Sequence, residues 1–118
     1  MTSYLKWLEK TVEEKLAADA IGRPLFVRLV LALTSDHGLL EQMLADAGEL
    51  SGRWLRSKSL RVDRLGEARE GYLSALVEYG GGQTALLAAE VVRGEAEARV
   101  LVVGQHGTLR FDDFPEAA

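Results

Sequence analysis

The run of residues 25–33 (LFVRLVLAL) is the most apolar in the chain, and it is the feature that most constrains the fold. Gly22 and Pro24 precede it, and Pro24 favours extended backbone just before itself. Read as a strand, the run has two faces that are both mainly apolar, with Arg28 as the exception. Such a strand is buried on both sides of its sheet. The fold must therefore cover both faces of this strand.

Two segments have the apolar spacing of helices that would cover one face of that sheet. Residues 37–51 carry an apolar stripe that follows N-cap residues at 34–36 and is predicted to end near Gly52. Residues 3–19 carry another, which indicates a helix packed on the sheet or, alternatively, an amphipathic helix that binds a partner. Its apolar residues recur at spacings of three and four: Leu5, Leu8, Val12 and Leu16.

The last third of the chain predicts strands connected as hairpins. Three apolar runs between residues 72 and 111 are separated by glycine-rich breaks at 80–82, around Gly94 and at 104–107. Residues 54–62 are predicted as a further strand at the sheet edge, protected by charge, and a site for an anionic ligand or partner is the alternative reading. The cations in question are Arg53, Arg56, Lys58, Arg61 and Arg64.

These elements predict an α+β fold in a single domain spanning residues 1–118. We expect an open, mostly antiparallel sheet of five or six strands with two or three helices packed on one face. The other face then needs a second subunit, so we expect a homodimer or higher homo-oligomer built sheet to sheet. The predicted interface residues are Leu25, Val27, Leu29, Leu31, Leu33, Leu86 and Ala88.

Charge and composition exclude several classes of protein. The net charge of −4 argues against a general nucleic-acid binder. The absence of cysteine excludes disulfides and thiolate metal sites. No apolar run is long enough to span a bilayer, and the N-terminal segment lacks the apolar core of a signal peptide. We therefore expect a cytoplasmic protein with neither a membrane nor a nucleic-acid partner.

The residues alone indicate no active site. His37 lies beside Asp36 and one turn from Glu41, but one imidazole with two carboxylates is a poor metal signal, and no metal site is predicted. His106 is expected to be solvated at a turn. Residues 102–107 (VVGQHG) contain closely spaced glycines, yet strand-like residues follow them, so a hairpin turn is predicted and not a dinucleotide site.

Four segments follow one another in a recognisable order: residues 20–28 (AIGRPLFVR), 38–42 (GLLEQ), 74–86 (SALVEYGGGQTAL) and 99–110 (RVLVVGQHGTLR). They resemble the GxIGxPxxVR motif, the Gly-rich helix start and the two hairpins (allxyxnGxxatl and xvxvxGtxGtl) of one domain. That domain is the C-terminal domain of the Gfo/Idh/MocA oxidoreductases, relatives of glucose–fructose oxidoreductase and inositol dehydrogenase. The resemblance covers nearly the whole chain and implies that the bare face of the sheet is a subunit interface.

The sequence departs from that family in the residues that carry its chemistry. The family has an N-terminal Rossmann domain that holds NAD(P), together with a Lys in an EKP segment, and this sequence has neither. The family's helix also carries a His–Asp pair that handles the proton of the substrate. The matching positions here fall at about Ala45 and Gly48, and neither side chain can move a proton. The resemblance therefore implies the fold and argues against the chemistry.

We accordingly expect a non-catalytic oxidoreductase-like domain that acts as an oligomerisation or interaction module, with no cofactor of its own. One alternative is the substrate-side subunit of a split NAD(P)-dependent oxidoreductase, completed by a separate Rossmann protein. A second alternative is a small-molecule binding protein with a sugar-like pocket between helix and sheet.

Overall fold

A computed structural model describes residues 3–18, 21–33, 39–93 and 96–113, and the structural statements below concern these residues. Two α-helices and a short 3₁₀-helix accompany six strands. The helices are α1 (Ser3–Ala18), α2 (Leu40–Leu55) and η2 (Ala68–Glu70). The strands are β1 (Pro24–Leu33), β2 (Ser59–Glu67), β3 (Tyr72–Tyr79), β4 (Thr84–Val91), β5 (Glu97–Gly104) and β6 (Thr108–Asp113).

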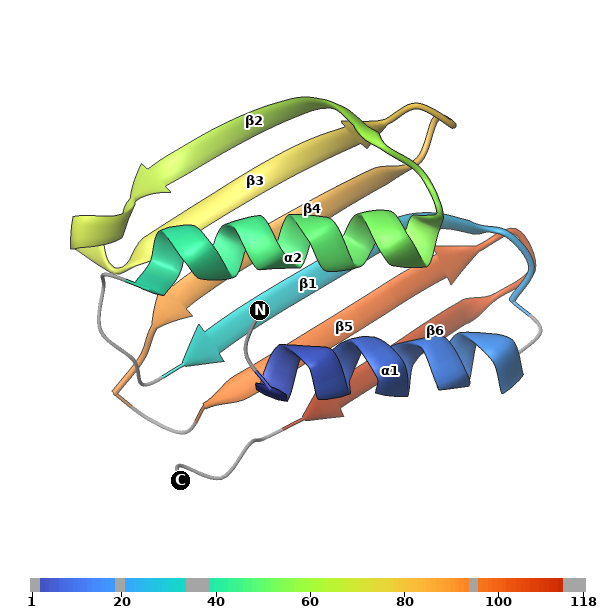
Figure 1. The fold of residues 1–118 in the computed structure, drawn as a ribbon, viewed down its shortest axis with the longest axis horizontal. Helices are drawn as coiled ribbons and strands as arrows, with labels where there is room; N and C mark the ends of the chain where they lie inside the picture. Colours follow the sequence, from blue (N-terminus) through green and yellow to red (C-terminus); the bar gives the residue numbers. More distant parts are fainter. Residues whose placement is uncertain (1–2, 19–20, 34–38, 94–95, 114–118) are drawn as a thin grey trace.

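The six strands form one open sheet in the order β2-β3-β4-β1-β5-β6 (Figure 1). Strand β1 is parallel to β4, and every other neighbouring pair is antiparallel. The apolar strand β1 thus lies in the interior of the sheet, as its two apolar faces predict. The predicted α+β fold with a mostly antiparallel sheet is confirmed.

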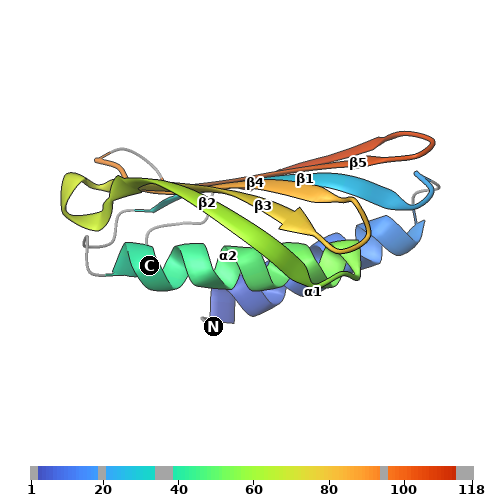
Figure 2. The ribbon, with the colours of Figure 1, turned by 90° about the horizontal axis from the view of Figure 1, so that it is seen from above.

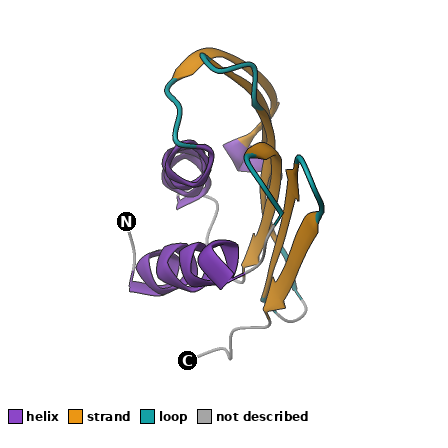
Figure 3. Ribbon diagram, turned by 90° about the vertical axis from the view of Figure 1, so that its right-hand side faces the viewer, coloured by secondary structure: helices purple, strands orange, loops and turns teal. Residues whose placement is uncertain are grey.

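The molecule has two layers, with both α-helices on the same face of the sheet (Figure 2). Helix α2 packs against β3, β4 and β1, and α1 lies beside it, against α2 and β6. Figure 3 shows that the β2 end of the sheet curves over α2. No described element covers the opposite face of the sheet, which we call the open face. No helix in the described ranges is long and apolar enough to cross a membrane.

The hydrophobic core lies between the sheet and the two helices. Alternate residues of β1, namely Val27, Leu29 and Leu31, have no exposed surface, because they point toward the helix layer. The helices contribute three of the four apolar residues predicted on α1, with Leu16 only partly buried against the core, and a longer set on α2. The helix residues in this core are Leu5, Leu8, Val12, Leu40, Met43, Leu44, Ala47, Leu50, Trp54 and Leu55.

Polar contacts join α1 to the rest of the molecule. The Glu9 carboxylate accepts two hydrogen bonds of 2.8 Å from the Arg53 guanidinium, and the Trp54 indole nitrogen donates to the Glu9 carbonyl at 3.3 Å. Near the start of α1, the Tyr4 hydroxyl donates to the Asp113 carboxylate at 2.8 Å. These contacts hold α1 against α2 and the β6 edge of the sheet.

The structure corrects the sequence prediction around residue 54. Helix α2 does not end near Gly52 but continues to Leu55, so Trp54 belongs to the helix and the edge strand begins only at Ser59. The reason is burial, because Trp54 and Leu55 are 3% and 2% exposed and extend the core-facing stripe of α2 by another turn. The predicted N-cap at 34–36 and His37 lie outside the described residues, as does Gly94.

Candidate functional site

The open face has an apolar centre. Neighbouring strands place Leu76 opposite Leu86, Leu86 beside Arg28, and Arg28 opposite Leu101. A second row places Val30 between Ala88 and Arg99. Leu76 and Leu86 are 43% and 41% exposed, although large apolar side chains of a strand are normally covered. The centre of the open face is therefore an exposed apolar surface with arginines beside it: Arg28 and Arg99 in these rows, and Arg110 opposite Leu101.

Charged residues surround this centre. Arg61 and Glu78 face one another at one end of the β2–β3 pair, and Asp63 lies opposite Leu76. On the far side, Arg99 lies opposite Asp112. An apolar centre with a charged rim is the usual composition of a protein–protein interface.

The predicted interface residues are divided between the two faces of the sheet. Leu86 and Ala88 lie on the open face, as the Leu76–Leu86 and Val30–Ala88 pairs show. Three others point into the core and are not available on the open face, which corrects their assignment: Val27, Leu29 and Leu31. Leu25 lies at the irregular start of β1 and is 40% exposed, and the side chain of Leu33 lies outside the described part of the structure. The alternating pattern of β1 predicted two apolar faces, but it does not specify which face the helices cover.

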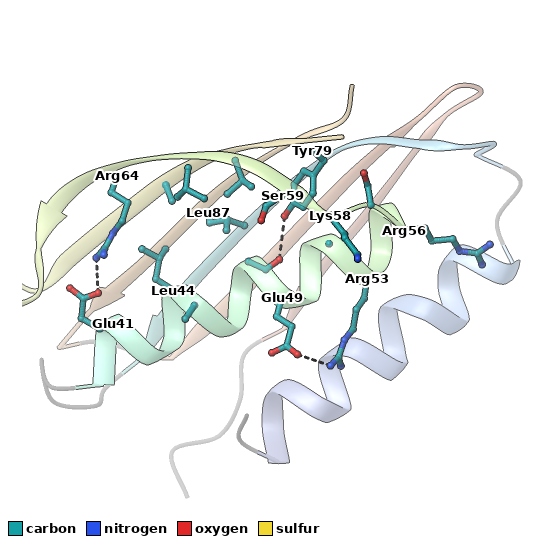
Figure 4. Close-up of a pocket in the computed structure, with 17 residues that line it drawn as sticks. Glu41, Leu44, Glu49, Arg53, Arg56, Lys58, Ser59, Arg64, Tyr79 and Leu87 are labelled. Carbon is teal, nitrogen blue, oxygen red and sulfur yellow. Dashed lines mark hydrogen bonds and ion pairs between the residues drawn. The ribbon is translucent and has the colours of Figure 1, made fainter. Parts of the chain in front are cut away.

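A second candidate site is a cavity of about 960 Å³ between α2 and strands β2, β3 and β4 (Figure 4). Its walls are mostly apolar and include Leu44, Val77 and Leu87. Small residues on α2, among them Ala45 and Gly48, leave space beside the helix for the cavity. A methyl group added at Gly48 would meet the Leu87 side chain at an ordinary 3.7 Å. We call this space the α2 cavity.

The two ends of the α2 cavity carry different polar groups. At one end Arg64 forms an ion pair of 2.6 Å with Glu41. At the other end lie Lys58, Ser59 and Tyr79, and Ser59 is the cross-strand neighbour of Tyr79. The Tyr79 hydroxyl donates to the carbonyl of Gly48 at 3.2 Å, and burial raises the pKa of Tyr79 to about 12. Tyr79 therefore stays protonated over the physiological pH range.

Ala45 and Gly48, the approximate positions at which the resemblance places a proton-handling pair, both line the α2 cavity. Neither carries a group that transfers protons. His106 is exposed in the turn between β5 and β6, where the Gly104 amide donates to the Gly107 carbonyl at 2.8 Å. The hairpin predicted for residues 102–107 is thus confirmed. Among the described residues, no group of three His, Asp or Glu side chains is placed to hold a metal ion.

The basic residues noted in the sequence have separate surroundings. Arg53 binds Glu9 and Glu49, and Arg64 binds Glu41. Arg61 pairs with Asp63 on the open face. Lys58 and Arg56 have no side-chain partner within the described ranges. Figure 4 shows Lys58 directed toward α2 and the Arg56 guanidinium directed past the end of the helix, away from the cavity.

Comparisons with known proteins identify similar folds. No family model and no curated protein matches this sequence. Among solved structures, a probable dehydrogenase from Thermotoga maritima has a TM-score of 0.77 at 13% identity, over 96% of this chain and 40% of that chain. The myo-inositol dehydrogenase of Lactobacillus casei, in complex with NAD(H) and myo-inositol, has a TM-score of 0.73 at 17% identity, over 93% of this chain and 37% of that chain.

A UDP-N-acetylglucosamine 3-dehydrogenase from Acidithiobacillus ferrooxidans is similar over 97% of this chain and 45% of that chain, with 15% identity and a TM-score of 0.68. The chain thus spans less than half the length of these dehydrogenases. At such identities the likeness shows the fold: the chain has the α+β architecture of one part of these enzymes. This agrees with the fold that the sequence motifs implied.

Proposed function

We propose that this chain is a non-catalytic oxidoreductase-like domain whose open face binds a second copy of itself. The observation that carries the proposal is the open face, where large apolar side chains remain more than 40% exposed: Tyr72, Leu76 and Leu86. Contiguous apolar surface of this kind marks interaction sites in soluble proteins. Removing it from water is the main favourable term in association.

The open face is large enough for a stable interface. The two longer dimensions of the molecule, 37 and 30 Å, lie in the plane of the sheet, and the third is 20 Å (Figures 1 and 2). Stable complexes bury roughly 800 Å² on each partner. A sheet of this extent meets that requirement, and a twofold axis would bring the same apolar centre together on both copies.

Arg28 limits how two copies can pack. It lies between Leu86 and Leu101 at the centre of the open face, and Arg99 and Arg110 lie near it on the same face. An unpaired charge buried in an interface is strongly destabilising. We expect the second copy to place a carboxylate near it, and Glu78 and Glu90 are available on the same face. Arg28 would thus select one packing geometry from the many that apolar contact alone allows.

The non-catalytic part of the proposal rests on the α2 cavity. The two positions that resemble the family's proton-handling pair are Ala45 and Gly48, which supply no acid or base. The remaining polar groups of the cavity lie at its ends and do not include a His–Asp pair among the described residues. This supports a role in assembly over one in proton transfer.

The test is the native mass, measured by light scattering and sedimentation over a wide concentration range. We expect the wild-type protein to be a dimer or higher oligomer and Leu86→Lys to be a monomer, because the new lysine would lie beside Arg28. Leu39→Lys is the matched control, since Leu39 is 51% exposed in the helix layer, away from the open face. A wild-type monomer at all concentrations, or a Leu86→Lys oligomer as stable as wild type, would reject the proposal.

A second candidate is a subunit that completes a two-part oxidoreductase with a separate cofactor-binding protein. The observation that favours it is the match to only 37% to 45% of each dehydrogenase chain. In that case a nucleotide-binding partner would co-purify with the tagged chain from its native host. Repeated purification without such a partner would count against this candidate and leave the first one unaffected.

A further inference from the structure

We propose that the α2 cavity binds an apolar carboxylate, meaning a molecule with a hydrocarbon body and one anionic end. The cavity lies on the helix-covered side of the sheet, so this proposal does not depend on association through the open face. Three observations support it: the size and apolar walls of the cavity, the position of Lys58, and the ion pairs that neighbouring arginines already form.

The first observation concerns the walls. Leu44, Val77 and Leu87 form the middle of the cavity, and about 960 Å³ of space adjoins them. Ligand sites in proteins have volumes of roughly 300 to 1,000 Å³ and are mainly apolar with a few placed polar groups. Water along such walls makes few hydrogen bonds, so an apolar occupant gains free energy by displacing it. A polyol would leave hydroxyls unpaired along the same stretch.

The second observation concerns the end of the cavity beneath the β2–β3 pair. The Lys58 ammonium has no hydrogen-bond or ion-pair partner within the described residues, and Figure 4 shows it directed toward α2. Ser59 adds a hydroxyl from the same strand end, with Tyr79 next to it. The Tyr79 hydroxyl already donates its one proton to the Gly48 carbonyl, so Lys58 and Ser59 are the donors left for an anion at this end. One ammonium beside one hydroxyl donor is suited to one carboxylate.

The third observation concerns how many cations of the cavity wall remain without an ion-pair partner. The other cations of the cavity wall are already neutralised, because Arg64 binds Glu41 at 2.6 Å and Arg53 binds Glu49 at 2.7 Å. The Arg56 guanidinium points away from the cavity (Figure 4). Among the described cations that line the cavity, the exposed Lys58 is thus the unpaired one that is directed toward α2. The site is therefore matched to a single negative charge and not to a phosphate or a dicarboxylate.

The experiment uses decanoate as the probe and 1-decanol as its uncharged counterpart, with dissociation constants from calorimetry and amide NMR titration. We expect decanoate to bind wild-type protein at least about tenfold more tightly than 1-decanol, since a charge-assisted hydrogen bond contributes more than a neutral one. Lys58→Gln should bring decanoate to the affinity of 1-decanol. Lys6→Gln is the matched control, because it removes the same charge from an exposed lysine of α1, a helix that does not line the cavity.

A second pair of variants tests the apolar part of the site. Ala45→Phe should abolish binding of both probes by filling the cavity from α2, whereas Ala18→Phe, on the exposed end of α1, should leave both unchanged. Circular dichroism and melting temperature establish that each variant is folded. Equal affinity of decanoate for the wild type and Lys58→Gln would overturn the charge assignment. Unchanged binding to a folded Ala45→Phe, or no binding to wild type, would overturn the site.

The same titration on the Leu86→Lys variant separates this proposal from the one on association. If that monomeric variant binds decanoate with wild-type affinity, the ligand site is independent of the open face. If binding is lost there while Ala45→Phe still binds, the probe is adsorbing to the open face, and the α2 cavity is not the site.

Discussion

At the scale of single residues, the Ser51 hydroxyl is an unusual group. It lies in α2 with no exposed surface, and it has no hydrogen-bond partner among the described residues. A buried hydroxyl without a partner costs about 1 to 3 kcal/mol, and alanine is also the better helix former. We predict that Ser51→Ala raises the free energy of unfolding by about 1 kcal/mol, measured by urea denaturation. A lower stability would show that the hydroxyl is bonded in solution.

Tyr79 makes stability depend on alkaline pH. Burial raises its pKa in the folded state to about 12, whereas an unfolded tyrosine titrates near 10. Between these values the unfolded state loses its proton while the native state keeps it, so the free energy of unfolding decreases as pH rises. The contribution is fully present below pH 10. We predict that Tyr79→Phe reduces this alkaline loss of stability.

The comparison uses urea unfolding at pH 9 and pH 11 for wild type, Tyr79→Phe and the control Tyr72→Phe. Tyr72 is 44% exposed on the open face. Tyr4 contributes in the same direction, because burial and its hydrogen bond to Asp113 raise the pKa of Tyr4. Equal alkaline losses in wild type and Tyr79→Phe would mean that the Tyr79 phenol is open to solvent.

At the scale of the elements, the end of α2 is held by a strained residue. Arg56 follows the helix with φ of 55°, in the left-handed region, and its backbone amide donates to Arg53 at 3.2 Å. Glycine adopts this conformation at no steric cost, whereas other residues lose roughly 1 kcal/mol. We predict that Arg56→Gly stabilises the protein by about 0.5 to 1 kcal/mol in thermal or urea unfolding. Arg56→Ala, which removes the charge and keeps the strain, should give no such gain.

The same helix end shows where local sequence signals fail. Gly52 predicted a stop, because glycine commonly follows the last turn of a helix. The helix continues past Gly52 because Leu50, Trp54 and Leu55 all pack into the core. The tertiary packing of Trp54 therefore outweighs the helix-breaking tendency of Gly52. The prediction of the α1 and β1 segments succeeded because their apolar periodicity has no competing signal.

The strand pairing could be predicted only in part. Adjacent hairpins such as β3–β4 and β5–β6 follow from the glycine-rich turns between them. The parallel pairing of β1 with β4 is non-local, and nothing in the two segments specifies it. The α2 cavity was beyond prediction for the same reason. The sequence places Lys58 among four arginines. Only the fold shows that three of them are ion-paired, that Arg56 is directed past the end of α2, and that Lys58 is directed toward α2.

At the scale of the whole molecule, the sheet has two faces that are covered in different ways. Alternate residues of β1 either join the core under the helices, as Leu29 does, or belong to the open face, as Val30 does. The predicted interface set combined core-facing and open-face residues, because both faces of β1 are apolar and the sequence does not distinguish them. A substitution at Leu29 thus affects the core, whereas one at Leu86 affects the surface that we propose for association.

The position of β1 also has a consequence for how the chain is made. Of the six strands it comes first in the sequence, yet both neighbours, β4 and β5, belong to the last third of the chain. Closing such distant pairs is entropically costly and slows folding. During synthesis β1 therefore has neither of its partner strands while α2, β2 and β3 are being made. Helices α1 and α2 precede β4 and β5 in the sequence, so we expect them to cover β1 until its partner strands have been made.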